Sequence, residues 1–165
     1  MIAGTFFHRT GLPFSATDSN MVGRLSGSSL AAFLAVPTGA VSNATCGKSA
    51  ATGTACLDAN QFAGTGAATT FSTIPRNFFR GPGYFNSDFS ILKTFTLTER
   101  VRFAIGGNFY NVFNHPNFAN PISDVSSGQF GTIQSTVVPP TSPYGAFVGS
   151  AVSGREVQVT GRISF

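Results

Sequence analysis

The chain has 165 residues, enough for one domain with a core, and carries a formal net charge of +4. Only 10% of its residues are charged, against about 25% in ordinary soluble proteins. No stretch approaches the roughly 20 consecutive apolar residues that a membrane helix needs. The few cations are scattered and are not interleaved with aromatic residues, so the composition argues against both a helical membrane span and a nucleic-acid-binding surface.

The first segment, residues 2–9, is a short apolar and aromatic run that predicts a strand and ends at the turn-forming residues Thr10 to Pro13. Residues 10–83 then lose the hydrophobic periodicity and are rich in Gly, Ser, Thr and Ala. A connection of this length is uncommon inside a compact domain but normal outside a large barrel. No secretory signal follows Met1, so we expect the chain to be the C-terminal part of a longer protein.

Two neighbouring segments, residues 84–97 and 101–113, show the alternation of strands with one apolar and one polar face. Lys93 interrupts the apolar parity, and we expect its long side chain to reach the membrane boundary. Leu92 interrupts the polar parity. Residues 98–100 form a tight connection between the two segments.

The last segment, residues 155–165, alternates most strictly. Its apolar parity ends at a terminal phenylalanine, which is similar to the C-terminal signal read by the outer-membrane assembly machinery. The candidate assembly signal consists of Val157, Val159, Gly161, Ile163 and Phe165.

The lengths of the connections fit a bacterial barrel, in which periplasmic turns are short and external loops are long. Counting back from the C-terminus, residues 114–154 and 10–83 would be external, and residues 98–100 would be a periplasmic turn. We therefore predict an all-β fold, an antiparallel meander of about four strands from the C-terminal end of a transmembrane β-barrel in the bacterial outer membrane. The smallest single-chain barrels have about eight strands, so the chain is not expected to transport alone.

A set of short motifs in residues 76–165 supports this interpretation. They are Gly81, Gly83, Asp88 and the run Phe113, Asn114, His115, Pro116, Asn117 and Phe118. Together they resemble the near-terminal region of TonB-dependent outer-membrane receptors, especially the Oar-like group with a carboxypeptidase-regulatory-like N-terminal domain. The resemblance implies a 22-stranded barrel with a plug domain. The partners of the chain would be outer-membrane lipid, the remainder of the parent barrel with its plug, and the barrel-assembly machinery.

Cys46 and Cys56 lie in the long irregular segment with nine residues between them. In an oxidising compartment, a disulfide would stabilise this loop by about 2–3 kcal/mol. Two free thiols or a metal site are the alternatives. Zinc would need two further ligands, and His8 and His115 are the only histidines.

The carboxylates are dispersed, so the sequence predicts no acid–base pair, no catalytic residue and no cofactor, and we do not expect an enzyme. Asp88 and Glu156 share predicted lumen faces with Arg102 and Arg162, and we expect these four to form a ladder of charges. An alternative remains open, because alternation does not distinguish lipid from a protein core. The chain could be a secreted or surface β-sandwich that binds its partners through Ser/Thr/Gly-rich loops.

Overall fold

The computed structural model describes residues 1–21, 33–42, 46, 51–64, 71–137, 149–150 and 154–165. These residues belong to two compact units. The strand unit comprises Met1–Arg9, Tyr84–Asn117 and Val137–Phe165, and the loop unit comprises Thr10–Gly83 and Phe118–Thr136. Within the described ranges, no helix is long and apolar enough to cross a membrane.

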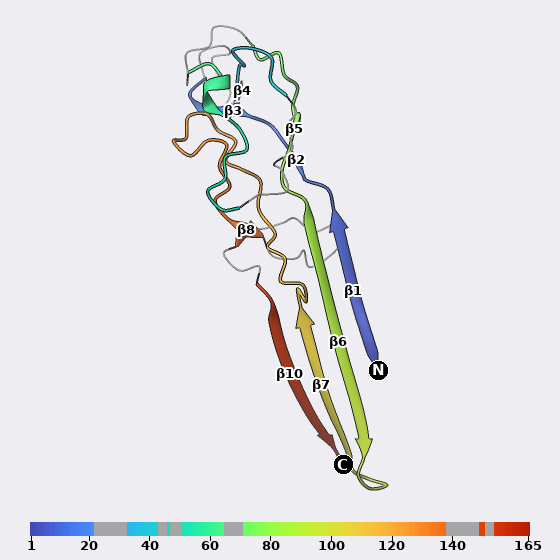
Figure 1. Cartoon of the computed structure of the whole chain (residues 1–165). Helices are drawn as coiled ribbons and strands as arrows, with labels where there is room; N and C mark the ends of the chain where they lie inside the picture. Colours follow the sequence, from blue (N-terminus) through green and yellow to red (C-terminus); the bar gives the residue numbers. More distant parts are fainter. Residues whose placement is uncertain (22–32, 43–45, 47–50, 65–70, 138–148, 151–153) are drawn as a thin grey trace. The chain divides into compact units, whose positions relative to one another are not determined.

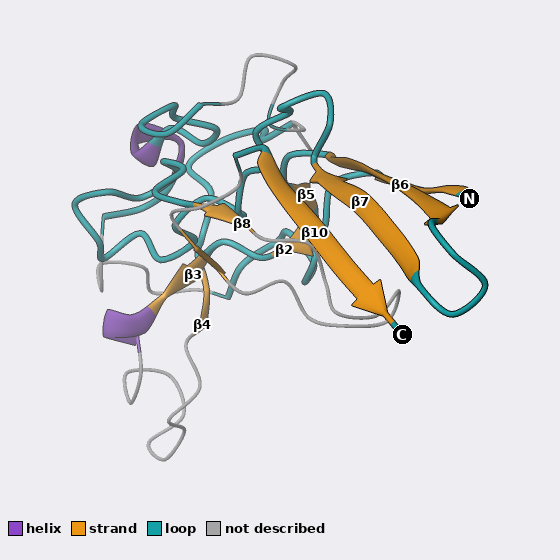
Figure 2. Ribbon diagram, turned by 90° about the horizontal axis from the view of Figure 1, so that it is seen from below, coloured by secondary structure: helices purple, strands orange, loops and turns teal. Residues whose placement is uncertain are grey.

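The strand unit is built on a four-stranded antiparallel sheet in the order β1-β6-β7-β10 (Figure 1). The strands are β1 (Ile2–Arg9), β6 (Tyr84–Thr96), β7 (Arg102–Tyr110) and β10 (Glu156–Ser164). Each of them pairs with its neighbour in this order, and β6, β7 and β10 lie side by side in Figure 2. The structure therefore confirms the predicted all-β antiparallel meander.

A tight turn from Leu97 to Val101 joins β6 to β7 and defines the turn end of the sheet. The N–H of Leu97 donates to the carbonyl of Val101 at 2.9 Å, and the N–H of Val101 donates to the Thr98 hydroxyl at 3.2 Å. The opposite end, where the long connections depart, is called the loop end below. Because the strands alternate in direction, β10 finishes at the turn end, whereas β1 starts opposite Ile91, partway along β6.

The predicted strand 101–113 is too long, because β7 ends at Tyr110. Asn111 has a φ of 49° and Asn114 has a φ of 52°. These left-handed conformations, which asparagine tolerates better than most residues, cannot continue an extended strand. The other three strands lie within one residue of the predicted bounds at each end.

The register places the alternating apolar residues of all four strands on the same face of the sheet. Its cross-strand rows include Ile2–Ile91–Gly107–Val159, Phe89–Phe109–Val157 and Phe95–Phe103–Ile163. Since side chains alternate between the faces of a strand, the hydroxyl, amide and charged side chains share the other face. The sheet thus has an apolar face and a polar face.

The loop unit has its own hydrophobic core, which the sequence did not predict. Two-residue ladders join β2 (Pro13–Phe14) to β5 (Phe79–Arg80) and β3 (Thr17–Asp18) to β4 (Phe33–Leu34). Single-turn 3-10 helices occur at η1 (Ser19–Met21) and η2 (Ala59–Gln61). A further two-residue ladder, which is not part of this core, pairs β8 (Thr136–Val137) with β9 (Gly149–Ser150), a segment of the strand unit. The core residues are Phe14, Ala16, Ala35, Leu57, Phe62, Phe79 and Phe130. They come from segments far apart in the sequence, so no local hydrophobic periodicity predicts them.

Candidate functional site

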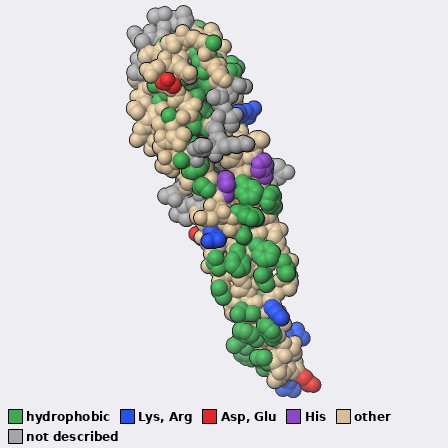
Figure 3. All heavy atoms as spheres, viewed as in Figure 1, with side chains coloured by type: hydrophobic (Ala, Val, Ile, Leu, Met, Phe, Trp, Pro, Cys, Tyr) green, Lys and Arg blue, Asp and Glu red, His purple; other side chains and the backbone are tan. Residues whose placement is uncertain are grey.

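The apolar face of the sheet is the candidate functional surface of the strand unit. Hydrophobic side chains gather along its strands in Figure 3. Ile2 is 71% exposed, Ile91 is 42% exposed and Val159 is 74% exposed. A contiguous apolar surface of this kind is unfavourable in water by about 25 cal/mol per Å² and carries no such cost in hydrocarbon. The face therefore has the chemistry of a lipid-contacting surface.

Aromatic side chains cluster at both ends of the apolar face, and a further pair, Phe89 and Phe109, lies between the two clusters. At the loop end, the ring of Phe85 contacts Phe6 at a centroid distance of 5.0 Å, His115 at 5.5 Å and Phe113 at 5.9 Å. At the turn end, Phe95 and Phe103 stack across the strands at 6.5 Å. Transmembrane barrels carry such aromatic girdles at both membrane interfaces.

Lys93 lies on the apolar face toward the turn end, opposite Ile105 on β7. Its Nζ is 5.2 Å from the centroid of the Phe95 ring, which itself lies closer to the turn. A cation over an aromatic face is favourable, and the side chain extends in the direction of the boundary rather than toward the middle of the strand. This geometry explains how the apolar face accommodates its lysine.

Leu92 interrupts the polar face because it covers Gly106, its partner on β7. A Cβ at Gly106 would lie 3.0 Å from Cδ1 of Leu92 and 2.9 Å from Oγ1 of Thr160. The structure shows a close contact, for which the absence of a side chain is required.

The charged residues of the polar face do not form the expected ladder. Glu156 pairs with Tyr110 at the loop end, whereas Arg102 pairs with Ser164 at the turn end. Arg162 follows Glu156 by six residues along β10, a separation of about 20 Å at the usual rise of a strand. Asp88 and Glu156 therefore lie toward the loop end, where Arg9 also belongs to the polar face, and Arg102 and Arg162 lie toward the turn end.

Asn117, from the predicted family motif, is 1% exposed and completes the loop end of β6. Its Oδ1 accepts from the N–H of Phe85 at 2.8 Å, and its Nδ2 donates to the carbonyl of Phe85 at 2.9 Å. The side-chain amide thus replaces a neighbouring strand for one residue. Through its own carbonyl, Asn117 also accepts from the N–H of Val137 at 2.8 Å.

Asn111, which no motif in the sequence marks, positions the start of the same motif run through its hydrogen bonds. Its side-chain amide forms two hydrogen bonds with the backbone of His115, at 2.9 and 3.0 Å. Its N–H donates to Oδ1 of Asp88 at 3.0 Å, and the same oxygen accepts from Nδ2 of Asn86 at 2.9 Å. The tolerance of asparagine for left-handed backbone at a strand end was the available signal.

The remaining motif residues have structural positions in their own units. Within the strand unit, Oδ1 of Asn114 accepts from the N–H of Arg155 at 3.1 Å, and Pro116 is exposed. In the loop unit, a side chain at Gly81 would collide with the amide of Asn120. Gly83 is exposed, and Phe118 forms a bridge with Thr136.

Cys46 and Cys56 form a disulfide within the loop unit. The N–H of Cys46 donates to the carbonyl of Arg80 at 3.1 Å, and the N–H of Cys56 donates to the carbonyl of Gly131 at 2.6 Å. The bridge therefore joins a segment beside β5 to a segment beside residues 118–136. In the described part of the chain, no three His, Cys, Asp or Glu side chains gather as metal ligands.

Asp124 joins the two connections that make up the loop unit. Its Oδ1 accepts from the N–H of Ser19 at 3.2 Å and from the hydroxyl of Ser126 at 2.7 Å. Burial by itself would raise the pKa of this carboxyl, but the hydrogen bonds from Ser19 and Ser126 outweigh it and lower the pKa below its ordinary value of 3.8. Thr17 adds backbone bonds to Ser123 and Val125, both at 2.8 Å.

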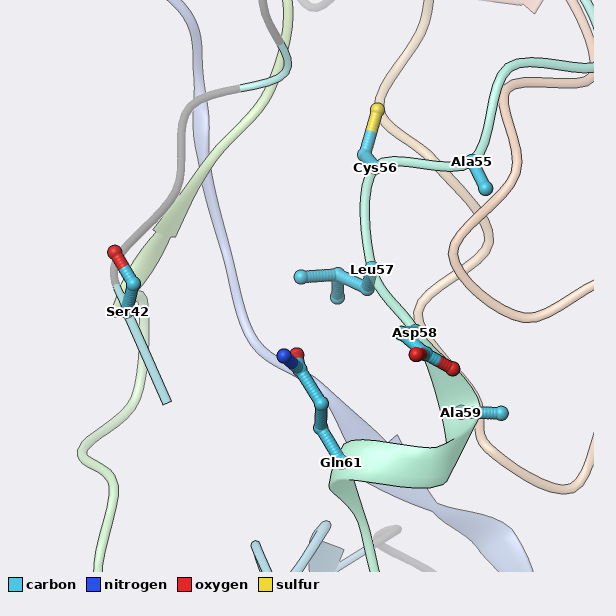
Figure 4. A pocket seen from close by; sticks show the side chains of 7 residues that line it. All are labelled: Ser42, Ala55, Cys56, Leu57, Asp58, Ala59 and Gln61. Atoms are coloured by element: carbon cyan, nitrogen blue, oxygen red, sulfur yellow. The ribbon is translucent and has the colours of Figure 1, made fainter. Parts of the chain in front are cut away.

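A pocket of about 500 Å³ lies in the loop unit (Figure 4). In Figure 4 the Gln61 side chain extends between Ser42 on one side and Asp58 on the other. Oδ1 of Asp58 already accepts from the N–H and Nδ2 of Asn60, at 2.9 and 3.0 Å, and so caps η2. The polar side chains of the pocket are exposed, and the pocket provides surface hydrogen bonds rather than a constellation for catalysis.

The residues of the candidate assembly signal lie on the apolar face of β10 and just beyond it. Val157 and Ile163 are 57% and 63% exposed, and Phe165 is fully exposed after the end of the strand. Their accessibility is compatible with a recognition signal. Recognition by the assembly machinery stays a prediction.

Comparison with known proteins identifies one family. The family model described as "Outer membrane beta barrel domain" matches residues 1–158. No curated protein and no solved structure matches the chain.

Proposed function

Because this chain belongs to the outer membrane beta barrel domain family, we propose that its sheet is a section of the wall of a TonB-dependent receptor. The family places the chain in the bacterial outer membrane and assigns its strands to a barrel rather than to a β-sandwich. A sandwich would need a second sheet over the apolar face. Among the described residues, the ladders outside the four-stranded sheet are each two residues long.

The observation that carries the proposal is the apolar face that continues across all four strands and is bounded by aromatic side chains. Strands of about 9–11 residues, tilted by about 45°, cross the hydrocarbon core of a bilayer. β7 and β10 have 9 residues each and β6 has 13, so their lengths suit this task. In this arrangement the apolar face contacts outer-membrane lipid and the polar face lines the lumen.

The edges of the sheet support a role as part of a larger wall. In the described structure, β1 pairs with β6 alone and β10 pairs with β7 alone. Each unpaired backbone group in lipid costs several kcal/mol, and closed barrels avoid this cost. The remaining strands of the parent barrel would pair with β1 and β10, and its plug would occupy the lumen. The chain alone would then transport nothing.

The assignment to a TonB-dependent, Oar-like receptor rests on the motif run from Phe113 to Phe118 and on the long connections 10–83 and 114–154, which we assign to the external side. The role is non-enzymatic: the chain supplies wall, external loops and the C-terminal signal from Val157 to Phe165 for the assembly machinery. The direct test is the reading frame upstream of the Met1 codon. Further alternating strands, a plug and an energy-coupling segment would support the proposal, and a barrel frame without a plug would refute the TonB-dependent part.

The orientation of the two faces can be tested in phospholipid vesicles with a pair of adjacent substitutions. Ile91 lies on the apolar face and Ser90 on the polar face of the same strand. Ile91→Lys should weaken insertion by about 2–4 kcal/mol, the cost of a cation on the lipid face near the bilayer midplane. Ser90→Lys should have little effect. The measurement is the vesicle-bound, protease-protected fraction, and equal losses in both variants would contradict the proposed orientation.

A further inference from the structure

The turn end of the polar face carries an arginine patch, and Glu99, the acidic side chain of the turn, forms no ion pair with it in the described structure. The patch consists of Arg100 in the turn, Arg102 at the start of β7 and Arg162 on β10, all exposed. Within the described part of the chain, no carboxylate forms an ion pair with any of the three. The acidic side chains of the polar face, Asp88 and Glu156, lie at the loop end.

The register fixes the spacing of the two strand arginines. Arg102 is directly opposite Ser164, so Arg162, two residues before Ser164, is its diagonal neighbour on the same face. Diagonal neighbours of this kind are about 7–8 Å apart. The side chains around them are small, namely Ala104, Thr96 and Ser164. Two like charges are thus held close together on an open surface, where they repel each other unless an anion neutralises them.

We propose that the arginine patch is a docking surface for an extended acidic protein segment with carboxylates at alternate positions. Side chains at positions i and i+2 of an extended strand point the same way and are about 6.6 Å apart. This separation matches the diagonal of Arg102 and Arg162. Each guanidinium can bind one carboxylate through two parallel hydrogen bonds, which gives geometric selectivity as well as attraction.

The position of the patch favours an acidic protein segment over a lipid headgroup as its partner. Arg102 and Arg162 lie on the polar face, opposite the apolar face that meets lipid, and the cation on the lipid side is Lys93. If the sheet is a barrel wall, as proposed above, the segment would enter the lumen from the turn end. The charge and spacing of the patch do not depend on whether the sheet belongs to a closed barrel. The docking proposal and the barrel-wall proposal can therefore fail separately.

The test uses the full chain in non-ionic detergent micelles and two fluorescent peptides of the same composition, Gly-Glu-Thr-Glu-Gly and Gly-Glu-Glu-Thr-Gly. The first places both carboxylates on one side of an extended peptide, and the second places them on opposite sides. We expect the first peptide to bind more tightly, with an affinity that falls as salt is raised because the surface is exposed. Equal binding of the two peptides would overturn the proposed geometry.

Arg102→Gln/Arg162→Gln should weaken the alternating peptide about tenfold, as expected for two exposed ion pairs of the stronger kind. The matched control, Arg76→Gln/Arg80→Gln, removes the same charge from exposed positions of the loop unit and should change the affinity less than twofold. Charge reversal, Arg102→Glu/Arg162→Glu, should transfer binding to the peptide Gly-Lys-Thr-Lys-Gly. Far-UV circular dichroism verifies that each variant keeps its β-sheet signal. Equal weakening by the control would show a net-charge effect and refute the site.

Discussion

Asn117 holds both backbone polar groups of Phe85 with its side-chain amide, at 2.8 and 2.9 Å, across 32 positions of sequence. The contact secures the loop end of β6, where Phe85 is also the centre of the aromatic cluster with Phe6, Phe113 and His115. One asparagine therefore connects the motif after β7 to the girdle at the end of the apolar face.

Replacement of Asn117 tests this connection. Asn117→Ala removes both hydrogen bonds to Phe85 and should lower the free energy of unfolding by about 2 kcal/mol, since each net hydrogen bond contributes about 1 kcal/mol. Urea unfolding in vesicles measures the change. Asn108→Ala on the polar face of β7 is the matched control and should change stability by less than about 0.5 kcal/mol. Equal effects of the two substitutions would contradict the role of Asn117.

A second prediction concerns Gly131 in the loop unit. Its φ is +74°, and a Cβ would collide with the carbonyl oxygen of Leu57, a core residue. Gly131→Ala should therefore destabilise the loop unit by about 2–4 kcal/mol. At Gly128, a Cβ would meet no atom within 4 Å, so Gly128→Ala should be nearly neutral. Hydrogen exchange measures the protection of the backbone amides of residues 118–136 in both variants. Similar protection in both would disprove the steric argument.

The disulfide gives a third prediction. Closure of the loop between Cys46 and Cys56 should stabilise the loop unit by about 3 kcal/mol through the entropy of the unfolded chain. Cys46→Ser/Cys56→Ser, or reduction of the native protein, should increase the rate of proteolytic cleavage within residues 51–64. Reductant should have no further effect on the double variant. Unchanged cleavage after verified loss of the bridge would show that the core alone holds this segment.

A fourth prediction follows from the lowered pKa of Asp124. Because the hydrogen bonds from Ser19 and Ser126 favour the ionised form, the carboxylate stabilises the loop unit above the ordinary pKa of 3.8. This contribution is lost as the pH falls through the lower pKa of the folded state. Protection of the Ser19 and Ser126 amides, corrected for intrinsic exchange, should decline below about pH 4.

Asp124→Asn provides the control for this pH dependence. The amide oxygen can still accept hydrogen bonds, but it does not titrate in this range. Protection of the Ser19 and Ser126 amides in the variant should therefore vary less with pH. A decline of the same size in the variant would assign the acid sensitivity to another group.

The strands and their faces could be predicted from the sequence because alternation is a local property of the chain. Phe89, Phe95 and Ile91 share a parity whatever β6 pairs with, since successive side chains point to opposite faces. The same rule identified the apolar side of β10 from Val157 to Ile163. A shift of register by one residue would have exposed the polar parity to lipid, so the pattern also constrained the pairing.

The tertiary structure alone decided the contacts that link distant positions. The end of β7 depends on left-handed Asn111 and its bonds to His115, and the loop unit depends on Asp124 meeting Ser19 across 105 positions. The diagonal of Arg102 and Arg162 likewise exists only once β7 and β10 are in register. Sequence by itself determined the periodicity, the apolar and polar parities and the turn. The fold decided which side chains complete the strand ends, because those hydrogen bonds join segments with no local relationship.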